Sequence, residues 1–595
     1  KIFVNLIVRM AKDGVCARTQ DRLNNRPIVN RAEGGRQRHG SLTIGYQRLW
    51  SLPGQICFHA SWGAIGAGTL RQFIPDFGFA NPKQRTLTLL MVFFLSVLLS
   101  ACALPIADRS ESSALDLDEA ADTRLGQAIA PQLESYPGNS GIHTLANPRD
   151  AFAARVLLAR AADRTLDVQY YIWHGDITGT LLLEELHTAA ERGVRVRLLL
   201  DDNGTSGLDA ELAALASHPS IEVRLFNPFV IRNPKWLGYL TDFSRANRRM
   251  HNKSFTADNQ ATIVGGRNIG DEYFGATAGV LFADLDVLAI GPVVPEVSSD
   301  FDRYWASASA YPVEQLLPAA SDADLRELER RALKLENDQA ATDYVKAVSE
   351  SDFVRQLLSG VLEFDWARTR MVSDSPAKGL GKSEREDLLA YKLGEILGEP
   401  ESRVALISPY FVPTRAGVDA FAALANKGIE VSILTNSLDA TDVAAVHAGY
   451  AKRRKALLKA GIHLYEMRRL SPDVERNQSA GPFGSSGSSL HAKTFAVDGE
   501  RLFVGSFNFD PRSINLNTEL GFVIESPALS EKIHEAFEES IPLRAYEVRL
   551  TENGELYWVE HVDGDVIRHE QEPNTGFLQR TGIFLLSILP IEWLL

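Results

Sequence analysis

The residues best suited to chemistry in this sequence form two copies of one pattern: a histidine, a lysine two positions later, and an aspartate five positions after the lysine. The copies are His251, Lys253 and Asp258, and His491, Lys493 and Asp498. Each continues into Gly-x-x-Asn, which ends at Asn268 in the first copy and at Asn508 in the second. One such pattern arises by chance in on the order of a few per cent of chains this long, so two copies with the same continuation indicate a shared role.

Paired histidines and lysines are groups that can cut and re-form a phosphodiester. The phosphodiester is an anion and repels anionic nucleophiles, whereas neutral imidazole can attack phosphorus and form a covalent intermediate. The departing alkoxide needs a general acid, which a second histidine can supply. The lysines and asparagines of both copies would hold the non-bridging oxygens as negative charge grows. We therefore expect a covalent phosphoryl-transfer site that needs no metal ion and no other cofactor; no Cys/His cluster has zinc spacing.

Each pattern is expected to lie on a β-hairpin. Side chains two positions apart on a strand share a face, so each histidine would present its imidazole beside the ammonium group of its lysine. Asp258-Asn259 and Asp498-Gly499 would form the turns, and residues 262–264 and 502–504 would return. We interpret the two motif aspartates as structural turn residues rather than proton carriers.

The hairpins fall at equivalent places in a longer internal repeat. The first half reads as strand 165–173, helix 181–192 and strand 194–200, and the second as strand 404–412, helix 417–427 and strand 429–434. Gly193 and Gly428 end the two helices. This alternation predicts βαβ units and a largely parallel sheet. The predicted fold class is α/β, with two homologous α/β sandwich halves related by a pseudo-twofold axis and one shared active site.

Each imidazole also needs a group that orients it. Glu519 and Asp284 lie in aligned strands, each eight residues before a proline (Pro527 and Pro292). We predict that these two acids orient the histidines. The alternative is that they are ordinary carboxylates at strand ends.

The paired motifs resemble those of the phospholipase D superfamily, and the wider sequence is similar to bacterial cardiolipin synthases of the C type. The similarity covers residues 140–595 and is carried by residues 166–173, 191–202, 408–413, 434–438 and 589–595. It implies two phospholipase D domains and a phosphatidyltransferase that makes cardiolipin from phosphatidylglycerol, phosphatidylethanolamine or both. It also implies His251 as nucleophile and His491 as acid, roles that the residues alone do not distinguish.

One position departs from the family pattern. Gly266 stands where the family has serine, which the second half keeps as Ser506. We expect an asymmetric site in which the first half lacks one hydroxyl donor near the phosphate.

Net charge and motif content distinguish a phosphatidyltransferase from a nuclease and from a non-catalytic lipoprotein. The net charge of the whole chain is −14. Residues 1–101 contribute +9, so residues 102–595 carry −23. Such an acidic body argues against a nucleic-acid partner and against a nuclease of the superfamily. The expected partners are membrane phospholipids, and the sequence does not reveal an accessory protein. The nearest alternative is a phospholipase D that transfers to water; two intact motifs disfavour a non-catalytic membrane-binding lipoprotein.

A secretory signal is expected near the front of the sequence. The apolar run 87–99 follows a short basic stretch and leads into Leu99-Ser100-Ala101-Cys102, which resembles a bacterial lipobox with an acylated cysteine. The alternative is an uncleaved anchor helix. We expect residues 83–101 to be a lipoprotein-type signal peptide and residues 1–82 a non-native upstream segment. Ala103 favours the outer over the inner membrane of a bacterial envelope, by resemblance to lipoproteins.

The remaining segments complete the expected organisation. It comprises a linker at 102–140, phospholipase D domain 1 at 141–335, domain 2 at 336–545, and a β-meander with an apolar tail at 546–595. The tail from Ile583 to Leu595 either lies at a membrane interface or packs as a terminal helix. Residues 322–349 are predicted to be helical and 372–383 a loop.

Two basic clusters are either lipid-headgroup contacts or solvated faces. They are Arg245, Arg248 and Arg249, and Lys452, Arg453, Arg454 and Lys455. His174, His187 and His447 lack motif context, so we predict that they are structural or surface residues.

Overall fold

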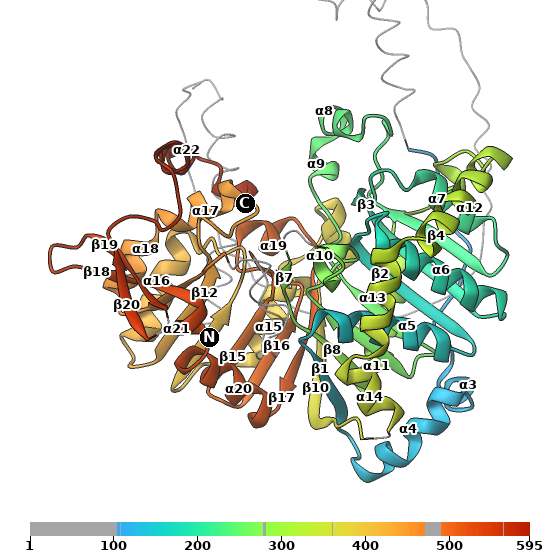
Figure 1. The fold of residues 1–595 in the computed structure, drawn as a ribbon, viewed down its shortest axis with the longest axis horizontal. Helices are drawn as coiled ribbons and strands as arrows, with labels where there is room; N and C mark the ends of the chain where they lie inside the picture. Colours follow the sequence, from blue (N-terminus) through green and yellow to red (C-terminus); the bar gives the residue numbers. More distant parts are fainter. Residues whose placement is uncertain (1–103, 108, 278–280, 360, 470–488, 563) are drawn as a thin grey trace, which may run out of the picture. The chain divides into compact units, whose positions relative to one another are not determined.

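The computed structural model describes residues 104–107, 109–277, 281–359, 361–469, 489–562 and 564–595, all within one compact unit (Figure 1). The expected upstream segment, the signal peptide and Cys102 lie outside the described residues.

The first half alternates strands and helices after two leading helices. Its helices are α3 (Leu117–Ala121), α4 (Arg124–Ser135), α5 (Pro148–Ala161), α6 (Ile177–Glu191), α7 (Asp209–Ala216), α8 (Gly238–Thr241), α9 (Phe243–Ala246), α10 (Asp271–Phe274) and α11 (Val293–Trp305), with 3₁₀ turns η2 (Lys235–Leu237) and η3 (Val313–Gln315). Its strands are β1 (Ser140–Leu145), β2 (Thr165–Ile172), β3 (Arg195–Gly204), β4 (Ile221–Phe226), β5 (Ser254–Ala257), β6 (Ala261–Gly265), β7 (Phe282–Ala283), β8 (Asp286–Ile290) and β9 (Ala310–Pro312).

Three helices, α12 (Asp322–Glu336), α13 (Gln339–Ser349) and α14 (Asp352–Leu358), separate the halves. The strands that follow are β10 (Asp365–Ser373), β11 (Arg403–Ile407), β12 (Glu430–Asn436), β13 (His463–Met467), β14 (Ser489–Leu490), β15 (Thr494–Val497), β16 (Arg501–Gly505), β17 (Leu520–Glu525), β18 (Ala545–Leu550), β19 (Leu556–Val562) and β20 (Asp565–His569). The helices are η4 (Pro376–Leu380), η5 (Arg385–Asp387), α15 (Leu389–Leu397), α16 (Thr414–Ala425), α17 (Ala444–Ala451), α18 (Arg454–Lys459), α19 (Pro511–Asn515), α20 (Pro527–Glu538), α21 (Ile541–Arg544), α22 (Phe577–Ile588) and η6 (Glu592–Leu594).

Both halves use the same strand pairing, which confirms the predicted repeat. β2, β3 and β4 are parallel, as are β11, β12 and β13. On the other side, the hairpins β5–β6 and β15–β16 and the returning strands β8 and β17 pair antiparallel. The sheet is therefore mixed, and the expectation of a largely parallel sheet is wrong. Helical crossovers make neighbouring strands parallel, whereas a tight hairpin makes them antiparallel.

The halves join through an antiparallel pair, as a pseudo-twofold relation requires. β1 pairs with β10, with Gly141 opposite Trp366, and each also pairs with the returning strand of its own half. Within the described residues this produces one continuous 18-stranded sheet. Helices α13 and α14 contact α5, and Tyr344 and Phe353 lie in the apolar core of the first half. The segment expected to open the second domain at residue 336 thus packs on the first half, and the chain changes halves at β10.

Glycine ends the equivalent crossover helices in the same way. Gly193 and Gly428 have φ values of 91° and 84°. In each case the next residue donates its N–H to a carbonyl five positions earlier, which closes the helix as a Schellman motif. This explains why glycine occurs at the same place in both halves.

Several element ends differ from the expectation. β3 continues through Asp201 to Gly204, because Gly204 pairs with Ile172 beyond an irregularity in the register. β11 ends at Ile407, since Pro409 has no N–H to donate to a neighbouring strand. β10 and η4 occupy part of the expected loop 372–383, whereas α12 and α13 confirm the helical prediction for 322–349.

The C-terminal region has the predicted meander, with β19 between β18 and β20. Gly554 and Gly564 lie in its two turns with positive φ. The tail forms α22 and η6, and Ile583 is buried against Leu438 and Ala448. No helix among the described residues is both long enough and apolar enough to cross a bilayer.

Candidate active site

Each motif histidine lies on a short extended segment that bonds to the other half of the molecule. The N–H of His251 donates to the carbonyl of Thr518 at 2.8 Å, and the N–H of His491 donates to that of Ala283 at 2.7 Å. The hairpin strands begin only after the lysines, at β5 and β15. The expectation that His-x-Lys lies within the hairpin strand is therefore wrong, because these backbone groups bond across the halves.

This cross-pairing places an acid beside each imidazole. Nδ1 of His251 lies 2.8 Å from Oε2 of Glu519, and Nδ1 of His491 lies 2.5 Å from Oδ2 of Asp284. Both carboxyl groups are fully buried, and the histidines are 5–6% exposed. The structure thus brings the two histidines to the two acids predicted to orient them, and each acid comes from the opposite half. Because Nδ1 faces the acid, Nε2 is the ring nitrogen left for chemistry.

The motif lysines lie buried beside the same histidines. Nζ of Lys253 donates to the carbonyl oxygen of His251 at 2.6 Å. Nζ of Lys493 donates to the carbonyl oxygen of His491 and lies 3.0 Å from its Nδ1. Burial lowers the pKa of Lys493 to about 8 and holds the pKa of Lys253 well below its usual range. A bound phosphate anion would favour the charged form of both lysines.

The two imidazole–acid pairs differ electrostatically. Burial and the two motif lysines hold the pKa of His251 well below 6.5. Burial also lowers the pKa of His491, but the carboxylate of Asp284 opposes that effect. Burial alone would raise the pKa of Asp284, yet the adjacent histidine and lysine outweigh it and hold that pKa below its ordinary value. Burial raises the pKa of Glu519 to about 7. His491 therefore faces an ionised acid, whereas His251 faces one that is closer to neutral.

The two asparagines that follow the motifs are buried but differ in their bonding. Oδ1 of Asn268 accepts the N–H of Ile172 at 3.2 Å, and its Nδ2 donates to the hydroxyl of Tyr273 at 3.0 Å. Oδ1 of Asn508 has no hydrogen-bond partner among the described residues. Asn268 is fixed by its neighbours, whereas Asn508 has unmet hydrogen-bonding capacity.

The motif aspartates lie at the far ends of the hairpins from the histidines. Asp258 accepts backbone N–H groups of residues 163–165, each at 2.8 Å. Asp498 accepts those of residues 401–403 at 2.8–3.2 Å. Both have positive φ, as expected for hairpin turns. Their contacts support the interpretation that they fasten the chain entering β2 and β11 and do not carry protons.

Comparison with known proteins agrees with this geometry. A family model described as "Cardiolipin synthase, PLD-like domain" matches residues 156–305 and 393–541, one match in each half. Cardiolipin synthase C of Escherichia coli (strain K12) is 52% identical over 475 residues, which cover 79% of this chain and all of the relative. The chain belongs to the PLD-like cardiolipin synthase family.

A more distant relative and a solved structure each match the same share of this chain. An uncharacterised protein of Helicobacter pylori (strain ATCC 700392 / 26695) is 32% identical over 79% of this chain and 92% of its own length. The crystal structure of phosphatidylserine synthase from Haemophilus influenzae Rd KW20 matches 79% of this chain and all of that chain, with a TM-score of 0.50 and 14% identity. At that identity, the likeness shows a common fold.

The halves of this family member differ beside the orienting acids. Oγ of Ser506 donates to Oε2 of Glu519 at 2.5 Å and accepts the N–H of Leu520 at 3.0 Å. A Cβ atom added at Gly266 would lie 2.2 Å from Oδ1 of Asp284. The expected asymmetry is confirmed beside the acids: in this PLD-like site, the hydroxyl of Ser506 bonds Glu519, whereas Gly266 leaves space for Asp284.

Aromatic side chains that were not predicted as site residues pack on the imidazoles. The ring of Tyr171 lies edge-on to His251, with 5.0 Å between centroids. Tyr273 and Phe282 lie 5.2 and 5.1 Å from the ring of His491. Tyr171 could have been found from its position at the carboxyl end of a strand with a parallel neighbour, where ligand-binding residues gather. The other two lie in short elements with no comparable signal.

The basic clusters of this cardiolipin synthase family member contain buried arginines. Arg249 is 2% exposed and bonds the carboxylate of Asp201. Arg454 is equally buried and pairs with Glu466 and Glu572. Lipid-headgroup contact is therefore wrong for these two side chains, because their charges are neutralised inside the protein. His447 is also buried and bonds Arg454, which agrees with a structural role.

The half-exposed His174 belongs to a cluster of polar side chains that does not include the motif histidines. One potential ligand atom each from His174, Asp176 and Glu272 lie within 4.8 Å of one another. Asp176 already accepts the N–H of Gly179 at the start of α6, and His174 pairs with Glu272 at 3.1 Å. These bonds agree with the structural or surface role predicted for His174.

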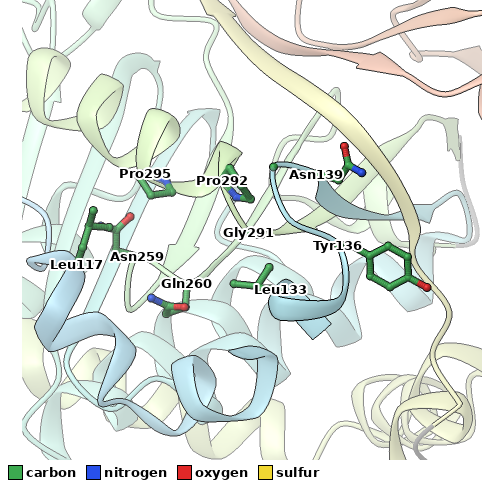
Figure 2. A pocket seen from close by; sticks show the side chains of 10 residues that line it. Leu117, Leu133, Tyr136, Asn139, Asn259, Gln260, Gly291, Pro292 and Pro295 are labelled. Atoms are coloured by element: carbon green, nitrogen blue, oxygen red, sulfur yellow. The ribbon is translucent and has the colours of Figure 1, made fainter. Parts of the chain in front are cut away.

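A separate cavity of about 340 Å³ lies at the turn of the β5–β6 hairpin (Figure 2). Leu133 and Tyr136 of the α4 region, Asn259 of the turn and Pro292 before α11 line it. The described motif histidines, motif lysines and orienting acids are not among its lining residues, so it is distinct from the active site.

Proposed function

We propose that this chain is a phosphatidyltransferase that makes cardiolipin from phosphatidylglycerol, phosphatidylethanolamine or both, through a phosphohistidine intermediate. The observation that carries the proposal is the crossed arrangement of two buried imidazoles, held by acids of opposite halves at 2.8 and 2.5 Å. The 52% identity to Cardiolipin synthase C of Escherichia coli, over the whole of that protein, supports the same product.

In the first step, Nε2 of His251 bonds to the phosphorus of the donor lipid, and the bond from phosphorus to the headgroup oxygen breaks. The headgroup oxygen leaves with a proton from Nε2 of His491. Lys253 and Lys493 neutralise the charge on the non-bridging oxygens. The products are a phosphatidyl group on His251, a neutral His491 and a free headgroup alcohol.

In the second step, neutral His491 takes the proton of a hydroxyl group of phosphatidylglycerol while that oxygen attacks the phosphorus. The bond between phosphorus and His251 breaks, and cardiolipin leaves. Both imidazoles return to their starting protonation, so atoms and protons balance over the cycle.

The electrostatics supports His251 as nucleophile and His491 as acid. The low pKa of His251 keeps its imidazole neutral, which is the nucleophilic form. Asp284 favours the imidazolium form of His491, which is the form that can donate a proton. A negatively charged substrate would raise both pKa values and make protonation of His491 easier.

Thin-layer chromatography of labelled lipids tests this function. Phosphatidylglycerol labelled in its acyl chains should yield labelled cardiolipin with the intact chain and none with His251→Ala. Phosphatidic acid as the sole labelled product would show hydrolysis and contradict the transfer function. Loss of labelled products in His251→Ala, at an unchanged melting temperature, would assign the reaction to this site.

We also propose that the enzyme acts on membrane phospholipids at the bacterial cell envelope and does not bind nucleic acid. The lipobox-like sequence supports acylation of Cys102 and attachment to the outer membrane, and the −23 charge of residues 102–595 disfavours nucleic acid. Cys102→Ser should block incorporation of labelled fatty acid and release part of the protein from membranes. Unchanged fatty-acid labelling of Cys102→Ser would contradict the anchor.

A further inference from the structure

Exposed apolar side chains gather in two short segments of the described chain. Of the twenty large hydrophobic side chains that are exposed among the described residues, ten lie within residues 236–243 and 577–593. The first segment presents Trp236, Leu240 and Phe243, which are 48–76% exposed. The second includes Leu578 and Leu585, at 84% and 58%. Scattered exposed leucines are ordinary, but such concentration indicates an interaction surface.

One arginine joins the two segments. Nη2 of Arg512 donates to Oδ1 of Asn247 at 2.6 Å, directly after α9. Nε of Arg512 donates to the carbonyl of Leu594 at 2.9 Å, and its backbone N–H donates to that of Leu595 at 2.6 Å. Arg512 lies in α19, four residues after Asn508. Figure 1 shows α8, α9 and α22 toward the same edge of the view, on either side of α19. The two apolar segments therefore belong to one face.

The same face leads to the reacting groups. The hydroxyl of Tyr239, within α8, donates to Oδ1 of Asn203 at 3.0 Å. Nδ2 of Asn203 donates to the hydroxyl of Tyr171 at 3.3 Å, and the ring of Tyr171 packs on His251. Two side chains thus connect α8 to the imidazole, which places the apolar segments at the edge of the active site.

Helix α22 is held in place with its apolar residues outward. Ile583 is 6% exposed and packs against Leu438 and Ala448, which fixes one face of the helix on α17. Phe584 and Leu585 remain 63% and 58% exposed. A helix of this length that is buried on one face and apolar on the other can lie in the plane of a membrane interface.

We propose that residues 236–243 and 577–593 form one membrane-docking surface, whose occupant is the lipid bilayer that contains the substrates. This inference rests on the proposed function, because the donor and the acceptor of that reaction are both bilayer lipids. Trp236 and Trp593 have side chains that favour the membrane–water interface. Residues 102–595 carry a net charge of −23, so we expect attachment through this face to come mainly from its apolar area. Docking at this face brings the lipid phosphate to His251 without removing the lipid from the membrane.

Polar substitutions test the surface with a matched control. The full-length Leu240→Gln/Leu585→Gln chain should bind vesicles of phosphatidylglycerol and phosphatidylethanolamine about tenfold less tightly. Transfer on vesicles should fall with binding, while transfer on detergent-dispersed lipid stays within about twofold, since dispersed lipid needs no docking. Leu333→Gln is the control, because Leu333 is 59% exposed on helix α12 outside the surface.

Tryptophan quenching identifies the occupant. Vesicles whose lipid acyl chains carry bromine should quench the intact chain, and Trp236→Phe/Trp593→Phe should lose part of that quenching. Unchanged vesicle binding by the leucine variant, or equal loss with Leu333→Gln, would overturn the proposal. A dimer that the leucine variant splits would assign the surface to a second copy and overturn it too. Vesicle binding is measured without turnover, so failure of the proposed function would appear separately, as absent transfer with normal docking.

Discussion

Replacing Asp284 with asparagine separates the role of His491 from that of His251. The Asp284→Asn side chain keeps its size and can still accept a hydrogen bond from Nδ1, but it lacks the negative charge that opposes the low pKa of His491. His491 should then lose its proton at a lower pH. Less imidazolium would be present at neutral pH to protonate the departing headgroup.

The size of this effect follows from the geometry. The carboxylate oxygen lies 2.5 Å from Nδ1, and the acid is fully buried. At such a distance an opposite charge changes a pKa by about 1–3 units, and each unit is a tenfold change in the ratio of imidazolium to imidazole. We therefore expect kcat/KM for phosphatidylglycerol to fall by about 10- to 1000-fold in Asp284→Asn.

The assay compares two donors with different leaving groups. A phosphatidyl nitrophenol donor expels an oxygen that needs no proton, so Asp284→Asn should slow it by only about threefold. Glu519→Gln is the matched control: Glu519 bonds the imidazole that attacks, so its loss should slow both donors alike. Equal losses on both donors in Asp284→Asn, at an unchanged melting temperature, would refute His491 as the acid. A leaving-group effect confined to Glu519→Gln would reverse the two roles.

Further predictions concern labelling, pH and stability. His251→Ala should abolish covalent labelling by phosphorus-labelled donor lipid, whereas His491→Ala should still label slowly with the nitrophenol donor; equal labelling of both variants would contradict the assignment. Activity should follow a bell-shaped pH profile: it rises as His251, whose pKa lies well below 6.5, becomes neutral, and falls as His491, whose pKa is also lowered, loses the proton that it donates to the headgroup oxygen. The folded pKa of Glu519, about 7, exceeds the usual 4.5. Its contribution to the free energy of unfolding is therefore fully present below pH 4.5 and falls by up to about 3 kcal/mol as pH rises through 7, and urea titrations of Glu519→Gln should lack that loss. Asp258→Ala removes the acceptor of three backbone N–H groups, of which that of Thr165 is buried, and should lower the free energy of unfolding by about 2–4 kcal/mol, with activity per folded molecule retained.

Much of the fold could be predicted because short-range features determine it. Glycine with positive φ closes the same crossover helix in both halves at Gly193 and Gly428, and the hairpin turns begin at aspartates. Such features depend on neighbouring residues, so they are visible in the sequence. The register of the two halves then follows from their repetition. The helical crossovers indicate only the parallel half of each sheet, whereas the hairpins and returning strands make the other half antiparallel.

The partners of the site residues could be predicted only in part. Alignment of the two halves predicts Glu519 and Asp284 as the orienting acids. Which histidine each acid contacts depends on the contacts of Thr518 and Ala283 with the opposite half, which no local pattern encodes. The bond from Ser506 to Glu519 is likewise tertiary. Residues whose role depends on the chain folding back over long distances leave no periodic signal.

The exchange of acids between the halves also affects how the two halves of the active site can become different from each other. Because each imidazole takes its acid from the opposite half, neither half holds a complete set of reacting groups. In a symmetric dimer of identical chains, one substitution would alter both imidazoles at once. Two copies within a single chain can change independently, so Glu519 lies beside Ser506 while Asp284 lies beside Gly266. Duplication within one gene thus allows one histidine to specialise in attack and the other in proton transfer.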